Sequence, residues 1–131
     1  MPGYAYLDAS AVVKLVVAEP ESGPLERDIL ERDGLISSAI VTTEVRRATA
    51  RVSRRLTQQA VEVLEALVLS HLTPTILDRA AALQPAQLRT LDAIHLATAL
   101  DLEIADLTFI SYDRRLLAAA RAAGVRVAAP R

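Results

Sequence analysis

Short apolar runs alternate along the chain with segments of helical spacing, and this alternation restricts the possible folds more than any other feature. The first run, Tyr4–Leu7, carries no charge, as is typical of a strand buried on both faces of a parallel sheet. Later strands are predicted at residues 35–37, 108–112 and 125–127. Because strands that alternate with helices build layered structures, the predicted fold class is α/β, with a mainly parallel sheet covered by helices on both faces.

The helical segments between these strands have apolar residues that recur every three or four positions. The first of them is rich in valine, so a strand remains an alternative there. A further, weaker strand is a candidate at residues 72–75, where Pro74 would confine it to a sheet edge or to its first residue. The predicted helices cover residues 11–17, 24–33, 39–55, 58–68, 78–83, 91–102 and 114–123.

The whole chain, residues 1–131, has the length of one domain with a single core. It contains no cysteine, which excludes disulfides, iron–sulfur clusters, thiolate zinc sites and cysteine nucleophiles. With only two histidines, a histidine-rich metal site is not expected either. The N-terminus lacks a basic segment followed by an apolar one, and no apolar run approaches the ~20 residues that span a bilayer. A cytoplasmic protein without membrane contact is therefore expected.

Four acids stand at or near the junctions between predicted strands and helices: Asp8, Glu44, Asp92 and Asp113. Each alone has a structural explanation, because Asp8 and Asp113 can cap helices, Asp92 can favour a helix dipole and Glu44 can face water. Right-handed crossovers, however, bring the ends of parallel strands to one edge of the sheet. Carboxylates that meet there repel unless a cation compensates, and oxygen ligands select a hard ion. We therefore predict a Mg²⁺ or Mn²⁺ site with Asp8, Asp92 and Asp113 as ligands.

A site of this kind supports metal-assisted hydrolysis of a phosphodiester bond. The cation lowers the pKa of a bound water and neutralises the leaving alkoxide, so no side-chain nucleophile is required. None is apparent, because Ser10, Ser37 and Ser111 have no local His and Asp arrangement to activate them. One carboxylate could serve as general base, and the residues leave open which of them does so.

Arginines are concentrated just after Glu44, although the formal net charge of the chain is only −1. Arginine also supplies all but one of the 15 Lys and Arg residues, and its planar fork binds phosphate in a bidentate manner. A solvated helix face is the alternative interpretation. The residues that we assign to the binding of nucleic-acid phosphates are Arg46, Arg47 and Arg51.

Four blocks of sequence resemble the signature blocks of PIN-domain ribonucleases, and most of all those of the VapC toxins of type II toxin–antitoxin pairs. They are residues 8–15 (DASAVVKL), 43–48 (TEVRRA), 91–99 (LDAIHLATA) and 111–116 (SYDRRL). The blocks occur in the expected order and together span essentially the whole chain. The third block is the most specific of the four.

The resemblance implies a three-layer α/β/α domain with about five strands, and a Mg²⁺- or Mn²⁺-dependent endoribonuclease that cleaves tRNA or rRNA. It further implies a homodimer and inhibition by a VapB antitoxin. By position, the catalytic acids would be Asp8, Glu44, Asp92 and Asp113, and Ser111 and Ser10 would be hydroxyls that support the metal ligands. His95 does not fall on an acidic position of the family, so we expect a packed or supporting role for it.

Two other classes of function are weaker. Phosphoryl-transfer domains of the haloacid dehalogenase and response-regulator types also place an Asp at the end of the first strand. The first type would need a second Asp where Ser10 stands, and the second would need a lysine after the last strand, whereas Lys14 is the only lysine. A catalytically silent PIN-like module that binds RNA or a protein is the alternative function, and four intact acids count against it.

Overall fold

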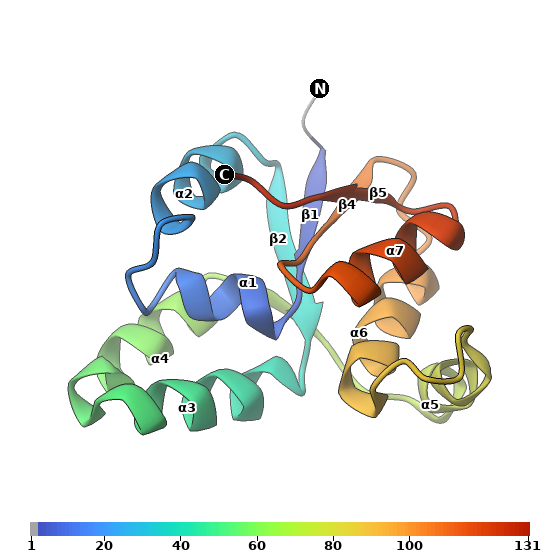
Figure 1. The fold of residues 1–131 in the computed structure, drawn as a ribbon, viewed down its shortest axis with the longest axis horizontal. Helices are drawn as coiled ribbons and strands as arrows, with labels where there is room; N and C mark the ends of the chain where they lie inside the picture. The colour runs from blue at the N-terminus through green and yellow to red at the C-terminus, as the bar shows by residue number, and fades with distance from the viewer. Residues whose placement is uncertain (1–2) are drawn as a thin grey trace.

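The computed structural model describes residues 3–131 and contains a five-stranded sheet in the order β3-β2-β1-β4-β5, with every pair parallel. Helices cover this sheet on both sides, which confirms the predicted α/β fold (Figure 1). Met1 and Pro2, which the predicted domain includes, lie outside the described residues. The strands are β1 (Tyr4–Leu7), β2 (Gly34–Ser38), β3 (Val68–Ser70), β4 (Leu107–Ile110) and β5 (Arg126–Ala128). The helices are α1 (Ala9–Lys14), α2 (Ser22–Leu30), α3 (Val41–Val52), α4 (Thr57–Glu65), α5 (Pro74–Ala82), α6 (Thr90–Asp101) and α7 (Arg114–Ala122).

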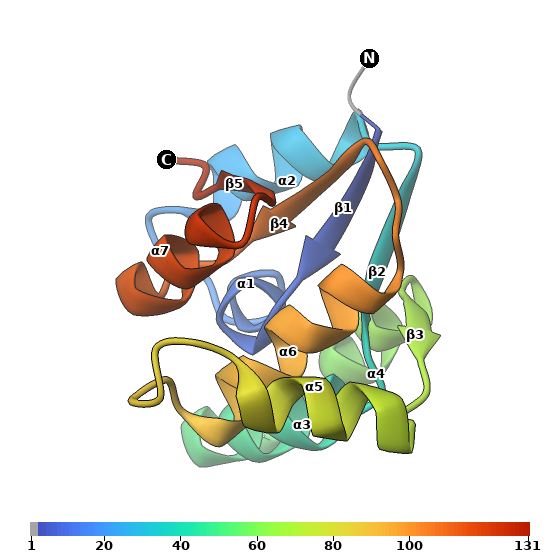
Figure 2. The ribbon, with the colours of Figure 1, turned by 90° about the vertical axis from the view of Figure 1, so that its right-hand side faces the viewer.

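Strand β1 lies at the centre of the sheet and sends alternate side chains into two cores. Ala5 and Leu7 pack with residues of α1, α2, α3 and α4 on one face. Tyr6 faces the other side, where it stacks on Phe109 of β4 at a ring-centroid distance of 5.2 Å and packs with α6 and α7. Figure 2 shows α6 and α7 on this second side of β1 and β4. Two buried faces explain why β1 carries no charge.

The third strand lies at Val68–Ser70, where it pairs with β2, so the candidate strand at residues 72–75 was wrong. Thr73 instead caps α5, because its hydroxyl accepts from the Ile76 amide, and Pro74 is the first residue of the helix. Proline suits that position since its missing N–H would have no partner there. In consequence α5 starts earlier than predicted and α4 ends earlier, at Glu65.

The predicted helix over residues 39–55 is also divided in the structure. Helix α3 ends at Val52, and a short 3₁₀ helix, η1 (Arg54–Leu56), follows it. Between them Ser53 is extended and accepts from the Arg55 amide, which satisfies a free donor at the start of the new turn. The valine-rich first segment is a helix, α1, and the alternative of a strand there was wrong.

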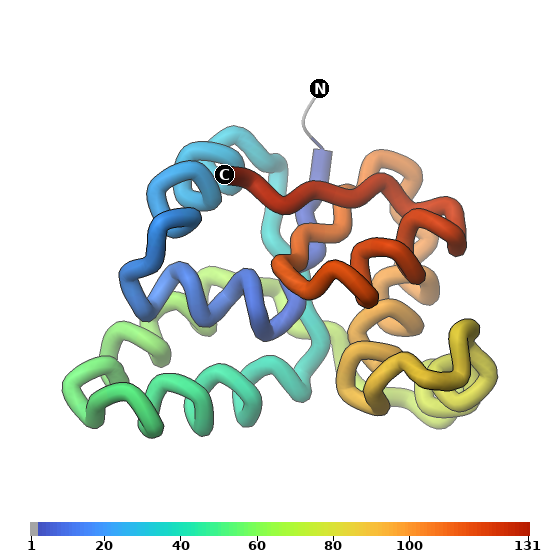
Figure 3. The backbone as a smooth tube through the Cα atoms, in the orientation of Figure 1, coloured from blue at the N-terminus to red at the C-terminus, as the bar shows by residue number. Residues whose placement is uncertain are grey.

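The chain passes from the carboxyl end of β1 almost directly into α1, as its trace shows (Figure 3). The last residues of the chain run back toward α2, where the Arg131 guanidinium lies 3.6 Å from Glu21 Oε2. The Tyr112 hydroxyl donates to the Pro130 carbonyl at 2.8 Å and fixes this segment beside the end of β4. No helix within residues 3–131 has both the length and the apolar character that crossing a bilayer requires.

Candidate active site

The site is built where β1 and β4 end side by side. Asp8 follows β1, is 2% exposed and caps α1 by accepting from the Ala11 amide at 3.0 Å. Its Oδ1 also accepts from the Ser10 hydroxyl at 2.7 Å, and its Oδ2 accepts from the Ser111 hydroxyl at 2.7 Å. Burial raises the pKa of the Asp8 carboxyl, while the hydrogen bonds from Ser111 and Ser10 oppose that rise. Donors that follow β1 and β4 therefore hold the Asp8 carboxylate in position.

The two serines link the end of β1 to the end of β4. Their hydroxyl oxygens lie 3.3 Å apart, and Ser10 Oγ accepts from the Tyr112 amide at 2.9 Å. Ser111 Oγ accepts from the Asp113 amide at 3.1 Å. The structure thus places both serines where the sequence predicted supporting hydroxyls, between Asp8 and Asp113.

Asp113 and Asp92 complete a group of three aspartates. Asp113 caps α7, because its Oδ1 accepts from the Leu116 amide at 3.0 Å, and Asp92 lies in the first turn of α6. Partial burial and the negative charges of Asp113 and Asp8 raise the pKa of Asp92 to about 6. Three segments that are distant in the sequence therefore bring their carboxyl groups close enough for their charges to interact.

Glu44 reaches the same region from α3 and is held by a buried histidine. His95 of α6 is 0% exposed, and its Nε2 lies 2.6 Å from Glu44 Oε1, while its Nδ1 lies 2.7 Å from the Tyr6 hydroxyl. A carboxylate only accepts, so Nε2 carries a proton and, in a neutral ring, Nδ1 accepts from Tyr6. The ring also meets Tyr6 edge-on at a centroid distance of 5.8 Å. A continuous chain of hydrogen bonds thus runs from β1 through α6 to α3.

This donor set suits a hard cation. No three His, Asp or Glu side chains within residues 3–131 are arranged as a ready-made metal site. Mg²⁺ does not require one, because it keeps several waters and commonly binds through one or two carboxylates together with substrate phosphates. Burial and the repulsion from Asp113 and Asp8 raise the pKa of Asp92, and a divalent ion would offset both effects. Asp8, Asp92 and Asp113 therefore fit such an ion by their chemistry.

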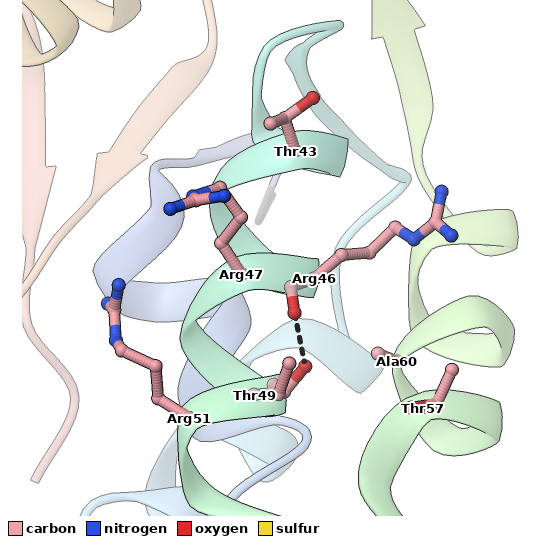
Figure 4. Close-up of a pocket in the computed structure, with 8 residues that line it drawn as sticks. Thr43, Arg46, Arg47, Thr49, Arg51, Thr57 and Ala60 are labelled. Carbon is pink, nitrogen blue, oxygen red and sulfur yellow. Dashed lines mark hydrogen bonds between the residues drawn. The ribbon is translucent and has the colours of Figure 1, made fainter. Parts of the chain in front are cut away.

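The three predicted RNA-binding arginines all lie on the exposed side of α3, but they do not point the same way. Figure 4 shows Arg47 and Arg51 extending toward α1, and Arg46 extending toward α4. Arg47 and Arg51 line a pocket of about 740 Å³ together with Ser10 and Glu44, here called the α1–α3 pocket. All three also line a neighbouring pocket of about 630 Å³ between α3 and α4. Of these three arginines, Arg47 and Arg51 alone line the pocket that contains Glu44.

Sequence reasoning missed several neighbours of the acids. Tyr6 was assigned to a buried strand only, and the contact between His95 and Glu44 was not predicted. The spacing of the sequence did indicate that His95 lies near the acids, because it follows Asp92 by three residues and therefore lies on the same face of a helix. A second group of arginines near Asp92 and Asp113 was also missed, although two of its members directly follow Asp113 in the sequence: Arg89, Arg114 and Arg115.

Comparison with known proteins places this geometry in a family. The model of the PIN domain matches residues 5–122. The chain is 42% identical to ribonuclease VapC46 of Mycobacterium tuberculosis, over 95% of this chain and 96% of the relative. It is 35% identical to ribonuclease VapC47 and 40% identical to ribonuclease VapC35 of the same species, with the same coverage.

A solved structure shares the fold as well. In the crystal structure of VapBC2 from Rickettsia felis, bound to a DNA fragment from their promoter, one chain matches with a TM-score of 0.68. The match covers 98% of this chain and 99% of that chain, at 13% sequence identity, and so bears on the fold alone. The family model and the curated relatives together identify the chain as a member of the PIN-domain family and, within it, of the VapC ribonucleases.

Proposed function

We propose that this protein is a metal-dependent endoribonuclease that hydrolyses RNA phosphodiester bonds, with Mg²⁺ or Mn²⁺ as its cofactor. The observation that carries the proposal is the convergence of three aspartates from separate segments: Ser10 and Ser111 link Asp8 to the segment that carries Asp113, and Asp113 lines one pocket together with Asp92. Asp8, Asp92 and Asp113 would hold the ion. When bound, such an ion activates a water and neutralises developing charge on the phosphate and the leaving oxygen.

The remaining residues would orient the reacting groups. Asp8 is locked by Ser10, Ser111 and the Ala11 amide, so it can present its carboxylate in one direction. Glu44 lines the α1–α3 pocket with Oε1 held by His95, which leaves Oε2 to accept a hydrogen bond from the attacking water. Arg47 and Arg51 border the same pocket and would hold RNA phosphates.

The partners and location belong to the same proposal. The VapC ribonuclease names of the relatives, and the VapBC2 complex that shares the fold, support inhibition by a VapB-like antitoxin. Cleavage of tRNA or rRNA, a homodimer and a cytoplasmic location are proposed with it. A search for a small open reading frame that overlaps or abuts this gene, followed by a cleavage assay with and without its product, tests the antitoxin.

The central test is RNA cleavage by the purified protein. We expect cleavage with Mg²⁺ or Mn²⁺, no cleavage with EDTA, and a loss of activity in Asp8→Asn and Asp92→Asn that folding does not explain. Mapping the RNA ends would identify the substrate and the site of cleavage. RNA binding without metal-dependent cleavage would instead support the alternative of a catalytically silent PIN-like module.

A further inference from the structure

A second basic pocket lies on the opposite side of the acids from α3. It has a volume of about 440 Å³ and sits at the amino-terminal ends of α6 and α7, and we call it the α6–α7 pocket. Asp92 and Asp113 form its acidic part. Three arginines line it as well: Arg89, which precedes α6, and Arg114 and Arg115, which begin α7.

These arginines are not occupied by the protein itself. All three are exposed, and none of them forms an ion pair with another side chain within residues 3–131. Arg89 lines the same pocket as Asp92 and Asp113. The pocket therefore presents free guanidinium groups directly beside carboxylates of the candidate metal site.

The two pockets on either side of the acids adjoin each other. Tyr112 lines both the α1–α3 pocket and the α6–α7 pocket, so the two meet at this residue. Leu91 lines the first pocket and its neighbour Asp92 the second, which gives another point of junction. In Figure 1, α1 and α3 lie to one side of the carboxyl ends of the strands and α6 and α7 to the other. Arginines thus flank the acids on both sides.

We propose that Arg89, Arg114 and Arg115 form a phosphate-binding subsite for the RNA strand, separate from the arginines of α3. The strand would enter over Arg47 and Arg51, pass the aspartates and leave through the α6–α7 pocket. This inference rests on the proposed function, because it takes RNA as the substrate. It adds a second anchoring point, which holds the strand on both sides of the bond that is cut.

Phosphate fits this pocket better than the carboxylates of an acidic peptide. A nucleic-acid strand carries a phosphate at every nucleotide, so one strand can contact the arginines of both adjoining pockets at once. The planar fork of each guanidinium group binds a phosphate in a bidentate manner. Acidic peptide binding is therefore kept as a competing outcome of the experiment.

The test measures binding of a fluorescently labelled, mixed-sequence single-stranded RNA in EDTA, as a function of NaCl concentration. Each phosphate contact with a single strand contributes about 0.7 to the slope of log K against log salt. We expect Arg89→Ala and the double variant Arg114→Ala/Arg115→Ala each to weaken binding and to reduce this slope by about 0.7 or more. Arg121→Ala is the matched control, because this exposed arginine lies at the other end of α7 and lines a different pocket.

Each result decides between named possibilities. Unchanged salt slopes in the variants would overturn the subsite, and so would equally strong, arginine-dependent binding of a polyglutamate peptide. If the arginines only neutralise Asp92, their removal would shift the pH profile of cleavage upward with no change in slope, which also overturns it. Because binding is measured in EDTA, the two proposals can fail separately. Reduced slopes in variants of a protein that never cleaves RNA would contradict the nuclease and support the subsite. Cleavage together with unchanged slopes would support the nuclease and contradict the subsite.

Discussion

His95 Nε2 lies 2.6 Å from Glu44 Oε1, so a fully buried residue of α6 sets the position of an acid on α3. The other ring nitrogen is engaged by the Tyr6 hydroxyl of β1 at 2.7 Å. With both nitrogens used, the ring has one orientation and one neutral tautomer. The position of Glu44 therefore depends on the core of the sheet and not on α3 alone.

Replacing His95 should reduce activity beyond its effect on folding. His95→Ala leaves Glu44 and Tyr6 without their partner, so we expect a loss of about 1–3 kcal/mol in unfolding free energy and a marked fall in kcat. His95→Gln can still donate to Glu44, and it should recover part of kcat at similar stability. The measurement is kcat and KM beside denaturant unfolding. Equal activity of the Ala and Gln variants would indicate that His95 only fills space.

The pKa of Asp92 predicts how stability without metal depends on pH. The folded carboxyl has a pKa of about 6, above its ordinary value of 3.8, so between these values the folded state holds more protons than the unfolded state. Stability should therefore fall as pH rises through this window, and Asp92→Asn should reduce that fall. Urea unfolding in EDTA at several pH values measures it. If the unfolding free energy of Asp92→Asn fell with pH as steeply as that of the wild type, Asp92 would not be the cause. A smaller fall is expected to remain in the variant, because the pKa of Asp8 is also raised.

Ser111→Ala should change the titration of Asp8. The hydroxyl donates to Asp8 Oδ2 and lowers the pKa of that carboxyl, so its removal should raise the pKa and move the onset of cleavage to higher pH. A stability loss of about 1–3 kcal/mol is expected as well. Ser37→Ala is the control, because Ser37 is equally buried and its hydroxyl donates to the Leu7 carbonyl and not to Asp8. A shift of the pH profile in both variants would point to general destabilisation.

Metal binding should stabilise the folded protein. At about 100 times its Kd, a divalent ion that binds only the folded state adds roughly 2.7 kcal/mol to the unfolding free energy. We expect this gain for the wild type with Mg²⁺ or Mn²⁺, and a much smaller gain for Asp8→Asn and Asp92→Asn. Thermal unfolding across a metal titration measures it. An equal gain in all three proteins would place the ion somewhere else.

The arginines of α3 should differ in their importance for RNA. Arg47 and Arg51 border the pocket that contains Glu44, whereas Arg46 extends toward α4 (Figure 4). We therefore expect Arg47→Ala and Arg51→Ala to weaken RNA binding and lower its salt dependence more than Arg46→Ala does. Fluorescence anisotropy at several salt concentrations compares them. A larger effect of Arg46→Ala would shift the RNA path to the groove between α3 and α4.

Much of the fold could be predicted because local signals and topology agreed. An uncharged run that ends at Asp8 identified the central strand, and Asp8 and Asp113 are caps as well as candidate ligands. Their meeting followed from the parallel order of the strands. Strand β3 could not be found in this way, because it has only three residues and the proline nearby belongs to the start of α5.

The candidate site was predictable only as far as residue type and strand order determine it. The contact of Glu44 with His95 joins residues 51 positions apart on two helices, and it depends on how α3 and α6, which cover opposite faces of the sheet, are placed relative to each other. No pattern of spacing encodes that placement. The arginines of the α6–α7 pocket were missed for the same reason, since Arg89 is brought beside Arg114 by the packing of α6 and α7.

Because Asp8 caps α1, its replacement affects the structure as well as the activity, and this matters when an inactive variant is chosen to capture RNA. Truncating Asp8 to alanine would delete three accepted hydrogen bonds and loosen the start of α1, so lost turnover could not be separated from damage to the scaffold. Asp92 caps no helix. Asp92→Asn is therefore the better starting point for a stable, silenced enzyme with which to capture bound RNA.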